Sequence, residues 1–357
     1  MSLKRINALR QKLRTDNLDG MILTHLDHVR YLTGFTGTAG LLVISPSGAD
    51  FFTDFRYTDQ ARKQVKGARV SIVNRDLVTG LKEFPKLNVK NRTYAFSSEY
   101  LTVALKEKLQ KVLPDSLFVP ADSVLADLGW VKDKDEIASI TKAVEISDLA
   151  FERILSMIAP GVRERELAAE LEYQMAMLGS EKRSFETIVA SGYRSALPHG
   201  VASAKKVKKG EFVTFDFGAT VNGYVSDITR TVVVGKPTQR QKKIYNIVLK
   251  AQKAGIRKVK AGVMAKAVDE ASRKVIEKAG FGKNFGHGTG HGIGFYVHLG
   301  PRVAPESEDK LMVNNVITIE PGIYISGWGG VRIEDDVVVT RAGGRVLNKA
   351  PKNLLVL

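Results

Sequence analysis

The sequence contains no cysteine. This absence excludes disulfide bonds, thiolate metal ligands and a cysteine nucleophile, and it fits a reducing compartment. Any metal ion bound by the chain must therefore be held by oxygen atoms or imidazole nitrogens. Histidine is scarce as well, with six among 357 residues. A site that uses imidazole has few residues from which to choose.

Long apolar runs are also absent. The basic residues at the start of the chain are not followed by an apolar segment of the signal-peptide type, and no run approaches the roughly 18–20 apolar residues of a membrane span. We therefore expect a soluble, cytoplasmic protein with no membrane partner.

The charge balance is strongly positive. Lysine and arginine number 54 against 38 acidic residues, for a net charge of +16, and such an excess raises the question of anionic partners such as nucleic acid. The basic residues are scattered over expected helical faces and turns and are not interleaved with aromatic residues. We interpret them as a solvated surface and expect no specific nucleic-acid partner.

The length predicts two domains, because single domains usually contain about 100–200 residues. In the first third, strand-like segments alternate with helical spacing, which is typical of an α/β domain. We expect strands near residues 20–24, 41–45, 51–54, 70–73 and 93–96, helices over 4–14, from 54 onward and over 100–112, and a glycine-punctuated loop over 29–40. A connector that includes 119–122 and 128–130 separates domains 1–125 and 126–357.

The second domain has two strand-rich blocks with helices before and between them. Helices are expected over 133–158, 164–178, about 238–261 and 265–279, and strands with turns over 187–192, 212–218, 223–235 and 316–357. This order is consistent with a domain of two halves. The whole chain is expected to be an α/β (α+β) protein.

The stretch from Phe285 to Pro301 holds three of the histidines among many glycines: His287, His291 and His298. Glycines leave the backbone close to whatever the imidazoles face, which a packed core rarely requires. A glycine-rich loop with incidental histidines is the alternative, and the stretch alone does not decide between the two interpretations.

Two aspartates occupy unfavourable positions. Asp216 lies within an apolar strand-like segment, and Asp227 follows eleven residues later on a returning strand, after an Asn-Gly turn. Burying a carboxylate costs free energy, and two carboxylates brought together repel each other unless a cation lies between them. The alternative is that Asp216 caps a turn and Asp227 pairs with Arg230.

Glu320 and Glu334 also stand at the ends of apolar strands, although acids on edge strands are ordinary. Together with the two aspartates and His291, they make a set of oxygen and nitrogen ligands, several of which are able to bridge. Such a set describes a two-metal carboxylate site, which suits Mn, Co, Fe or Zn and lowers the pKa of a shared water toward neutrality.

These residues lie in ordered motifs that resemble the pita-bread metallopeptidases, specifically the Xaa-Pro peptidases (aminopeptidase P and prolidase). The motifs are Phe-Asp-Phe-Gly at 215–218, Ser-Asp-Ile-Thr-Arg-Thr at 226–231, Gly-His-Gly-Thr-Gly-His-Gly-Ile-Gly at 286–294, Ile-Glu-Pro-Gly at 319–322 and Val-Arg-Ile-Glu-Asp at 331–335. The likeness extends upstream to Ser-Gly-Tyr-Arg-Ser-Ala-Leu-Pro-His-Gly at 191–200. Segments 31–37 and 53–58 resemble the creatinase/prolidase N-terminal domain.

The resemblance implies a creatinase/prolidase-like domain over 1–125 and a pita-bread catalytic domain over 126–357. It implies hydrolysis of the Xaa-Pro bond, at the N-terminus of peptides or in Xaa-Pro dipeptides, by a water or hydroxide that bridges two divalent metal ions. Manganese is the expected metal, with cobalt, zinc or iron as alternatives. Proline-containing peptides are the implied substrates, and a homodimer is the implied assembly.

The resemblance also implies roles for single residues. The implied metal ligands are Asp216, Asp227, His291, Glu320 and Glu334. Glu320 would accept a proton from the attacking water, and Arg332 would orient a ligand carboxylate. His199 and His298 would flank the substrate, with His298 stabilising the tetrahedral intermediate or relaying a proton to the leaving nitrogen. His287 would shape the pocket, unless it is a hydrogen-bonded structural histidine, and the glycines would clear space for metals and peptide.

Two positions depart from the family's pattern. Many relatives carry acidic residues where this chain has Tyr296 and Leu299. Since neither is a ligand in that pattern, the departures concern substrate preference, with Tyr296 beside the pocket. Arg302 could meet the free carboxylate of an Xaa-Pro dipeptide, which would favour prolidase, or could be a surface arginine.

Three alternatives stay open from the sequence. A methionine aminopeptidase shares the catalytic fold but generally lacks a domain like residues 1–120. A creatinase-like member lacks the metal ligands that this chain retains. A non-catalytic binding protein on the same scaffold is the alternative from a different functional class.

Overall fold

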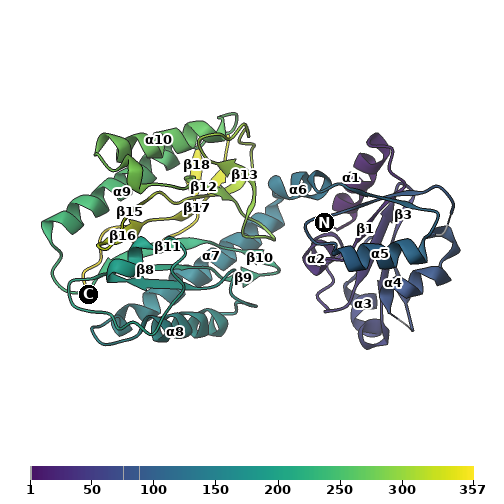
Figure 1. The fold of residues 1–357 in the computed structure, drawn as a ribbon, viewed down its shortest axis with the longest axis horizontal. Coiled ribbons are helices and arrows are strands. Elements are labelled where there is room, and N and C mark those ends of the chain that lie inside the picture. Colours follow the sequence, from purple (N-terminus) through teal and green to yellow (C-terminus); the bar gives the residue numbers. More distant parts are fainter. Residues whose placement is uncertain (1, 75, 88) are drawn as a thin grey trace. The chain divides into compact units, whose positions relative to one another are not determined.

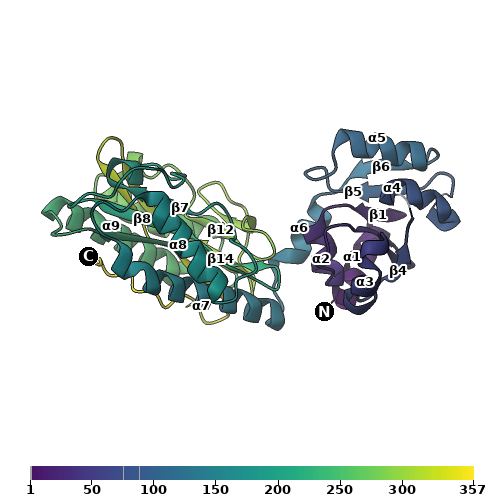
Figure 2. The ribbon, with the colours of Figure 1, turned by 90° about the horizontal axis from the view of Figure 1, so that it is seen from below.

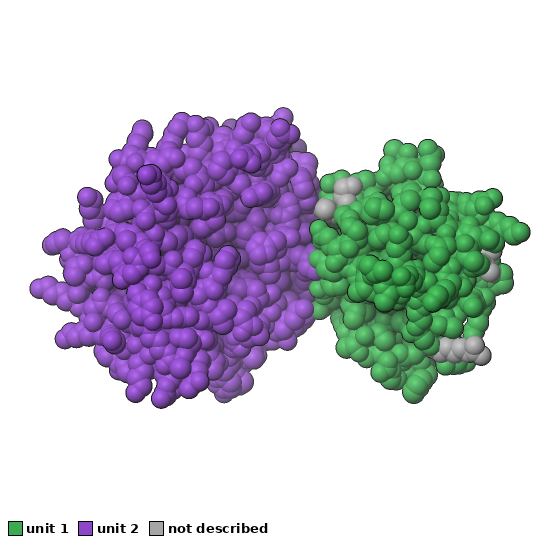
Figure 3. Space-filling model, in the orientation of Figure 1, with its two compact units in different colours: residues 1–128 green, residues 129–357 purple. Residues whose placement is uncertain are grey.

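The computed structural model describes residues 2–74, 76–87 and 89–357. The chain forms two compact units, residues 1–128 and 129–357, which are coloured separately in Figure 3. No helix among the described residues has the length and apolarity needed to cross a membrane.

The first unit is built on a six-stranded mixed sheet of order β4-β3-β2-β1-β5-β6. Its strands are β1 (Gly20–Leu23), β2 (Leu41–Ser45), β3 (Gly48–Thr53), β4 (Arg69–Ile72), β5 (Thr93–Phe96) and β6 (Leu117–Pro120). The helices are α1 (Ser2–Thr15), α2 (Leu26–Thr33), α3 (Thr58–Gln64), α4 (Leu77–Gly80), α5 (Val103–Val112) and α6 (Ser123–Trp130), with short 3-10 turns at Phe55–Tyr57, Leu81–Glu83 and Pro85–Leu87. The hairpin of β2 and β3 confirms the strands expected there.

One core of this unit lies between the sheet and the helices α4 and α5. Phe52 and Phe96 of the sheet pack with Leu109 and Val112 of α5. The helix α5 begins later than expected, because the side chain of Thr102 accepts a hydrogen bond from the backbone N–H of Leu105 and caps the first turn.

Two expectations for this unit are wrong. Residues 26–33 form the helix α2 in place of the first part of the expected loop; the helix buries Val29 and Leu32 and ends at Gly34, whose φ of 84° is left-handed. Residues 117–120 form β6 and 123–130 form α6, where a connector was expected. Proline at residue 120 obscured β6, which tolerates it because the strand lies at the sheet edge.

The second unit places its strands between two pairs of helices. Figure 1 shows α7 (Lys134–Ile154) and α8 (Glu164–Met177) on one side, and α9 (Gln239–Lys258) and α10 (Ala265–Lys278) on the other; Figure 2 gives the view from below. The expected helices are thus confirmed, although residues 155–157 form a 3-10 turn after α7. Helix α7 begins with a capping box between Asp133 and Glu136.

The strands of this unit form several sheets. The three-stranded sheet has the order β11-β8-β7, and the five-stranded sheet has the order β13-β12-β14-β17-β18. Strands β9 and β10 form a hairpin, as do β15 and β16. The bounds are β7 (Ile188–Ser191), β8 (Phe212–Phe217), β9 (Thr220–Val221), β10 (Tyr224–Val225), β11 (Ile228–Val233), β12 (Gly290–Gly292), β13 (Leu299–Val303), β14 (Val316–Ile319), β15 (Gly322–Ile325), β16 (Gly329–Arg332), β17 (Asp335–Val339) and β18 (Gly344–Val346), with 3-10 turns at Gly192–Ala196 and Gly282–Asn284.

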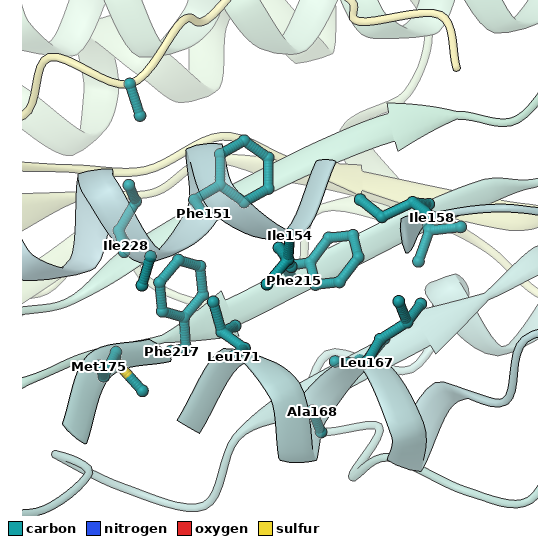
Figure 4. Packing of buried hydrophobic residues seen from close by; sticks show 14 of the residues in the cluster. Phe151, Ile154, Ile158, Leu167, Ala168, Leu171, Met175, Phe215, Phe217 and Ile228 are labelled. Carbon is teal, nitrogen blue, oxygen red and sulfur yellow. The ribbon is translucent and has the colours of Figure 1, made fainter. Parts of the chain in front are cut away.

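A compact apolar core fixes β8 against the helices α7 and α8. Figure 4 shows Phe151 of α7 and Leu171 of α8 gathered around Phe215 and Phe217 of β8. The ring of Phe151 lies 5.8 Å from that of Phe215 and 6.2 Å from that of Phe217, centroid to centroid. Because alternate residues of a strand face opposite ways, this packing turns Asp216 to the other face of β8.

Candidate metal centre

Strands β8 and β11 place the two aspartates on one face. In the antiparallel register Asp216 is opposite Thr229. Asp227 lies two residues before Thr229, directly before the start of β11. Residues two apart on a strand share a face, so both carboxylates project to the same side. The intervening chain turns back at Asn222 and Gly223, whose φ values of 52° and 79° are those of a type I′ turn.

The second half of the unit supplies the other three side chains. His291 lies in β12, and its backbone N–H donates to the hydroxyl of Thr318 in β14 at 3.1 Å. The register of β14 with β17 pairs Ile319 with Asp335, so that Glu320 and Glu334, the next residues along, face each other. The backbone N–H of Glu334 donates to the carbonyl of Thr229 at 3.2 Å, which joins the two halves.

The predicted ligand residues therefore converge. Nε2 of His291 lies 3.4 Å from Oε1 of Glu320 and 3.7 Å from Oδ2 of Asp227. One ligand atom each from Asp227, His291 and Glu334 lies within 4.8 Å of the others. Asp216 is close enough for its charge to raise the pKa of both Asp227 and Glu320. The geometry is that of a cluster able to hold metal ions.

The carboxylates are crowded, and Arg332 offsets only part of their mutual repulsion. Burial and the charge of Glu334 raise the pKa of Asp227 well above its usual range, and burial and the charge of Glu320 do the same for Glu334. Burial raises the pKa of Glu320 to about 8, although Arg332 opposes the shift. Oδ1 of Asp216 and Oδ1 of Asp227 are buried and accept no hydrogen bond from any described residue. A bound cation would stabilise these buried oxygen atoms.

The imidazole of His291 is set up as a neutral donor ligand. Its Nδ1 lies 3.1 Å from the carbonyl oxygen of Gly292. A carbonyl oxygen only accepts, so the proton belongs on Nδ1 and the lone pair of Nε2 faces the carboxylates. Burial and the neighbouring His298 lower the pKa of His291 to about 4, which keeps the ring neutral near pH 7.

Neighbouring side chains orient the carboxylates. The hydroxyl of Thr229 donates to Oε2 of Glu334 at 2.6 Å and accepts from Nε of Arg332 at 3.0 Å. A second guanidinium nitrogen of Arg332 donates to Oδ2 of Asp216 at 2.5 Å. The backbone N–H of Asp227 donates to the carboxylate of Asp336 at 3.0 Å. The bonds from Thr229 and Arg332 restrict the direction in which ligand oxygen atoms can point, and the bond to Asp336 holds the backbone of Asp227.

The alternative interpretation of the two aspartates is wrong. Asp216 lies within β8 and caps no turn. The guanidinium of Arg230 donates to Oδ1 of Asp335 at 2.8 Å and to the carbonyl of Ala350 at 2.9 Å, so Asp227 is not its partner.

His287 is tied into a chain of hydrogen bonds. Arg332 donates to the hydroxyl of Tyr324 at 2.9 Å, and this hydroxyl lies 2.9 Å from Nε2 of His287. Nδ1 of His287 lies 2.7 Å from the carbonyl of Gly288, which assigns the proton to Nδ1. Burial and the charge of Arg332 lower the pKa of His287 to about 4. The half-buried ring packs against Phe285, with 5.0 Å between centroids.

His298 and His199 are exposed near the cluster. The ring of His298 lies 4.4 Å from that of His291, centroid to centroid. Partial shielding of this exposed ring from water, and then the charge of His199, lower the pKa of His298. Pro198 accepts a hydrogen bond of 3.2 Å from Arg332 through its carbonyl, which fixes the residue preceding His199 beside the cluster.

Arg302 lies in β13 and Tyr296 precedes that strand. Arg302 is exposed, and its backbone N–H donates to Asp309 at 2.7 Å; among the described residues its guanidinium has no carboxylate partner. Tyr296 is half-buried and packs on Phe295, with 4.7 Å between ring centroids.

Two glycines of the histidine stretch are required by close backbone packing. A Cβ added to Gly290 would lie 2.0 Å from the carbonyl oxygen of Thr318, and one added to Gly292 would lie 2.1 Å from that of Gly300. These two glycines allow β12 to approach its neighbours closely, whereas a Cβ added to Gly286 would meet nothing within 4 Å.

Several supporting residues escaped sequence reasoning: Thr229, Thr318, Tyr324 and Asp336. Thr229 carried a usable signal, because it stands two residues after Asp227 on one strand and so shares its face. Tyr324 carried none, since its contacts come from the pairing of β15 with β16.

Comparisons with known proteins agree with this architecture. The model of metallopeptidase family M24 matches residues 138–341, and that of the creatinase/prolidase N-terminal domain matches residues 5–128. The chain is 38% identical over 354 residues to an Xaa-Pro dipeptidase of Pyrococcus horikoshii, covering 99% of both. It resembles a solved Xaa-Pro dipeptidase from Bacillus anthracis at 43% identity, with a TM-score of 0.96 and 100% of both chains covered.

A solved X-Pro aminopeptidase from Thermotoga maritima is also similar, at 38% identity, with a TM-score of 0.88 and 98% of each chain covered. The matched M24 region contains all five clustered ligand-type residues. This chain belongs to metallopeptidase family M24 and carries the creatinase/prolidase N-terminal domain in front of its metallopeptidase domain.

Proposed function

We propose that this protein is an Xaa-Pro dipeptidase that depends on two divalent metal ions. The observation that carries the proposal is the convergence of four carboxylates and one neutral imidazole, with buried oxygen atoms of Asp216 and Asp227 that accept no hydrogen bond from the described residues. The relatives named Xaa-Pro dipeptidase, at 38% and 43% identity over nearly the whole chain, support the substrate class.

The residues present fit a dinuclear metal group. Asp216, Asp227, His291, Glu320 and Glu334 would hold the ions, because all five offer hard oxygen or imidazole donors and no cysteine occurs to favour soft metals. Bound divalent cations supply a Lewis acid and a water with a pKa lowered toward neutrality. We propose manganese as the working metal, with cobalt, zinc and iron as alternatives for metal analysis to decide.

The chain's own residues then account for substrate handling. Glu320, which lies among the proposed ligands with Oε1 3.4 Å from Nε2 of His291, accepts the proton of the attacking water. His298, exposed beside His291, donates a hydrogen bond to the substrate carbonyl as negative charge develops there, or passes a proton to the leaving proline nitrogen. His199 contacts the substrate on the side opposite His298.

Arg332 and His287 act on the pocket through fixed positions. Arg332 orients Asp216 through its 2.5 Å hydrogen bond and is itself held by Tyr324. His287, locked between Tyr324 and the carbonyl of Gly288, shapes the wall on the substrate's N-terminal side. We keep Arg302 as the proposed partner of the dipeptide's free carboxylate and Tyr296 as a residue beside the pocket.

The experiment compares an Xaa-Pro dipeptide with an Xaa-Pro-Yaa tripeptide. Metal-free protein is reloaded with Mn²⁺, and released proline or first residue is followed by chromatography. The proposal expects faster cleavage of the dipeptide; faster cleavage of the tripeptide would reassign the protein to the aminopeptidase P type. Asp227→Asn should abolish cleavage, whereas the exposed Glu306→Gln should leave it unchanged.

Two results would remove the enzymatic proposal. One is no cleavage of either peptide by metal-loaded protein; the other is full activity of the Asp227→Asn variant. A peptide with an N-terminal methionine and no proline tests methionine aminopeptidase specificity in the same assay. We also propose domains 1–125 and 126–357, a homodimer and a cytoplasmic location, the assembly being tested by sedimentation equilibrium.

A further inference from the structure

One buried carboxylate closes the loop that carries His199. The loop runs from Ser191, the last residue of β7, to Ser203, and Glu164 reaches both ends of it from the first turn of α8. The side chain of Glu164 is 0% exposed. It is separated from the loop by more than twenty residues in the sequence, so the fold has placed it there.

Each oxygen atom of Glu164 serves a different end of the loop. Oε1 accepts from the backbone N–H of Ser191 at 2.7 Å and from its hydroxyl at 2.8 Å. Oε2 accepts from the backbone N–H of Ser203 at 3.1 Å and from its hydroxyl at 2.6 Å. Oε2 also accepts from the guanidinium of Arg194 at 2.8 Å. The carboxylate thus receives five hydrogen bonds.

The loop is braced across its middle as well. The second terminal nitrogen of Arg194 donates to the carbonyl of Val201 at 2.8 Å, on the far side of His199. Arg194 therefore connects Glu164 to Val201 across the inside of the loop. Charge-assisted hydrogen bonds of this kind are stronger than neutral ones.

The same loop touches the metal cluster's supports. The hydroxyl of Ser195 accepts from the backbone N–H of Gly330 in β16 at 2.8 Å. The carbonyl of Pro198 accepts from Arg332, which binds Asp216. A Cβ on Gly330 would lie 2.3 Å from the carbonyl oxygen of Ser195, so loop and strand are in close contact. Motion of the loop base would move His199 relative to Asp216.

A local explanation for Glu164 is insufficient. A glutamate at the start of a helix can simply favour the helix N-terminus, and Glu166 does so in α8 by accepting from the backbone N–H of Arg163 at 2.8 Å. Glu164 makes none of its five hydrogen bonds to its own helix. Its contacts all go to the His199 loop.

We propose that Glu164 is a positioning residue for the reaction: it holds the Ser191–Ser203 loop so that His199 faces the substrate beside the metal cluster. The proposal rests on the proposed function for its kinetic consequence. Its structural part, the clamping of the loop, stands independently of the substrate.

The test combines amide hydrogen exchange with a double-mutant cycle. Glu164→Gln keeps the shape of the side chain but removes its charge and half of its accepting capacity. Exchange at residues 192–202 should accelerate by about tenfold or more, while the core strands exchange as before. Glu166→Gln is the matched control, because it removes one charge from the same helix turn, and it should leave both exchange and activity within about twofold.

Kinetics then asks whether Glu164 acts through His199. Glu164→Gln and His199→Ala should each lower kcat/KM on an Xaa-Pro dipeptide by on the order of tenfold or more. The kcat/KM of the double variant should be no lower than that of the less active single variant. A misplaced His199 and a missing His199 lose the same interaction. Independent losses that multiply in the double variant would overturn the positioning role.

Two further results are decisive. If the wild-type protein cleaves no Xaa-Pro peptide, the proposed function is wrong, and hydrogen exchange alone tests whether Glu164 holds the loop. Faster exchange of the Glu164→Gln variant confined to residues 192–202 would support this role. Unchanged exchange would overturn it. Should Glu164→Gln fail to fold, Ser203→Ala replaces it, because that variant removes one bond of 2.6 Å from the clamp and leaves the carboxylate in place. The same criteria then apply to Ser203→Ala.

Discussion

The hydroxyl of Thr229 donates a 2.6 Å hydrogen bond to Oε2 of Glu334 and so links β11 to the segment between β16 and β17. It also accepts from Arg332. A threonine without charge thus fixes the direction of one proposed metal ligand and of the arginine that orients another.

Replacing Thr229 by valine should weaken metal binding without unfolding the protein. Valine has the same shape but cannot donate, and loss of such an outer hydrogen bond typically costs about 10–100-fold in metal affinity. Titration calorimetry with Mn²⁺ measures the change. Thr187→Val is the control, because Thr187 is buried and its hydroxyl has no hydrogen bond in the described part of the chain. Equal affinities of the Thr229→Val variant and the wild type would contradict this prediction.

Asp227→Asn should have opposite effects on the metal-free and the metal-loaded protein. Asp227 is 5% exposed, and its neighbours Glu334 and Asp216 disfavour its charge, so the amide should raise the thermal midpoint of metal-free protein near pH 8. The same change removes a proposed ligand, so added Mn²⁺ should no longer raise that midpoint. Scanning calorimetry with and without Mn²⁺ checks both halves. A variant that metal stabilises as strongly as it does the wild type would argue against Asp227 as a ligand.

The contribution of Glu320 to the stability of metal-free protein should fall as pH rises from about 6.5 to 8. The pKa of Glu320 is raised from 4.5 to about 8 in the folded state. Between these values the native state binds the proton that the unfolded state has lost, so the free energy of unfolding decreases with pH, by up to about 1.4 kcal/mol per pH unit for one group. Above pH 8 the contribution of Glu320 levels off.

The two histidines His287 and His291 make the free energy of unfolding depend on pH in the opposite direction at lower pH. The pKa values of His287 and His291 are lowered from 6.5 to about 4, so between these values the unfolded state binds more protons and stability rises with pH. Burial lowers the pKa of Lys132 from 10.5 to about 7, so Lys132 also makes stability rise with pH above about 7. The contribution of Glu320 is therefore measured as the difference between the wild type and the Glu320→Gln variant in urea titrations at pH 6.5 and pH 8. Glu320→Gln should remove the decrease in stability that Glu320 contributes between these pH values; the same pH dependence in both proteins would contradict the assignment.

Truncation of the core beneath β8 should be costly. Phe151→Ala removes a ring that is 0% exposed and lies against Phe215 and Phe217, and such changes cost about 3–5 kcal/mol. Urea titration measures the loss, with metal-free protein as the reference state. Phe55→Ala is the comparison, because Phe55 is 74% exposed, and it should change stability by less than about 0.5 kcal/mol. Similar effects of the two variants would be inconsistent with the packing in Figure 4.

The residues of the candidate site could be picked out from the sequence because a carboxylate within an apolar strand contradicts its surroundings. Asp216 and Glu320 both show that contradiction. Their meeting point could not be derived in the same way, because it depends on the register of β14 with β17 and on the joint between Glu334 and Thr229. Register follows from packing across the sheet, which a single sequence does not display.

The fold was predictable where a pattern extended over many residues. Helices α7 to α10 follow from apolar spacing over at least three turns, whereas α2 has eight residues and ends at Gly34, so the glycines after it suggested a loop. Strand β6 was hidden by its own proline at residue 120. Short elements are determined by tertiary contacts more than by local preference.

The hydrogen bonds between Glu334 and Thr229 affect how the second unit unfolds. Ligand-type residues from β8 and β11 on one side, and from β12, β14 and the β16–β17 segment on the other, meet only when both halves are in register. A bound ion would act as a cross-link between them, so that partial opening of either half releases it. Metal concentration would then govern how often the unit opens to a protease, by mass action on the closed state.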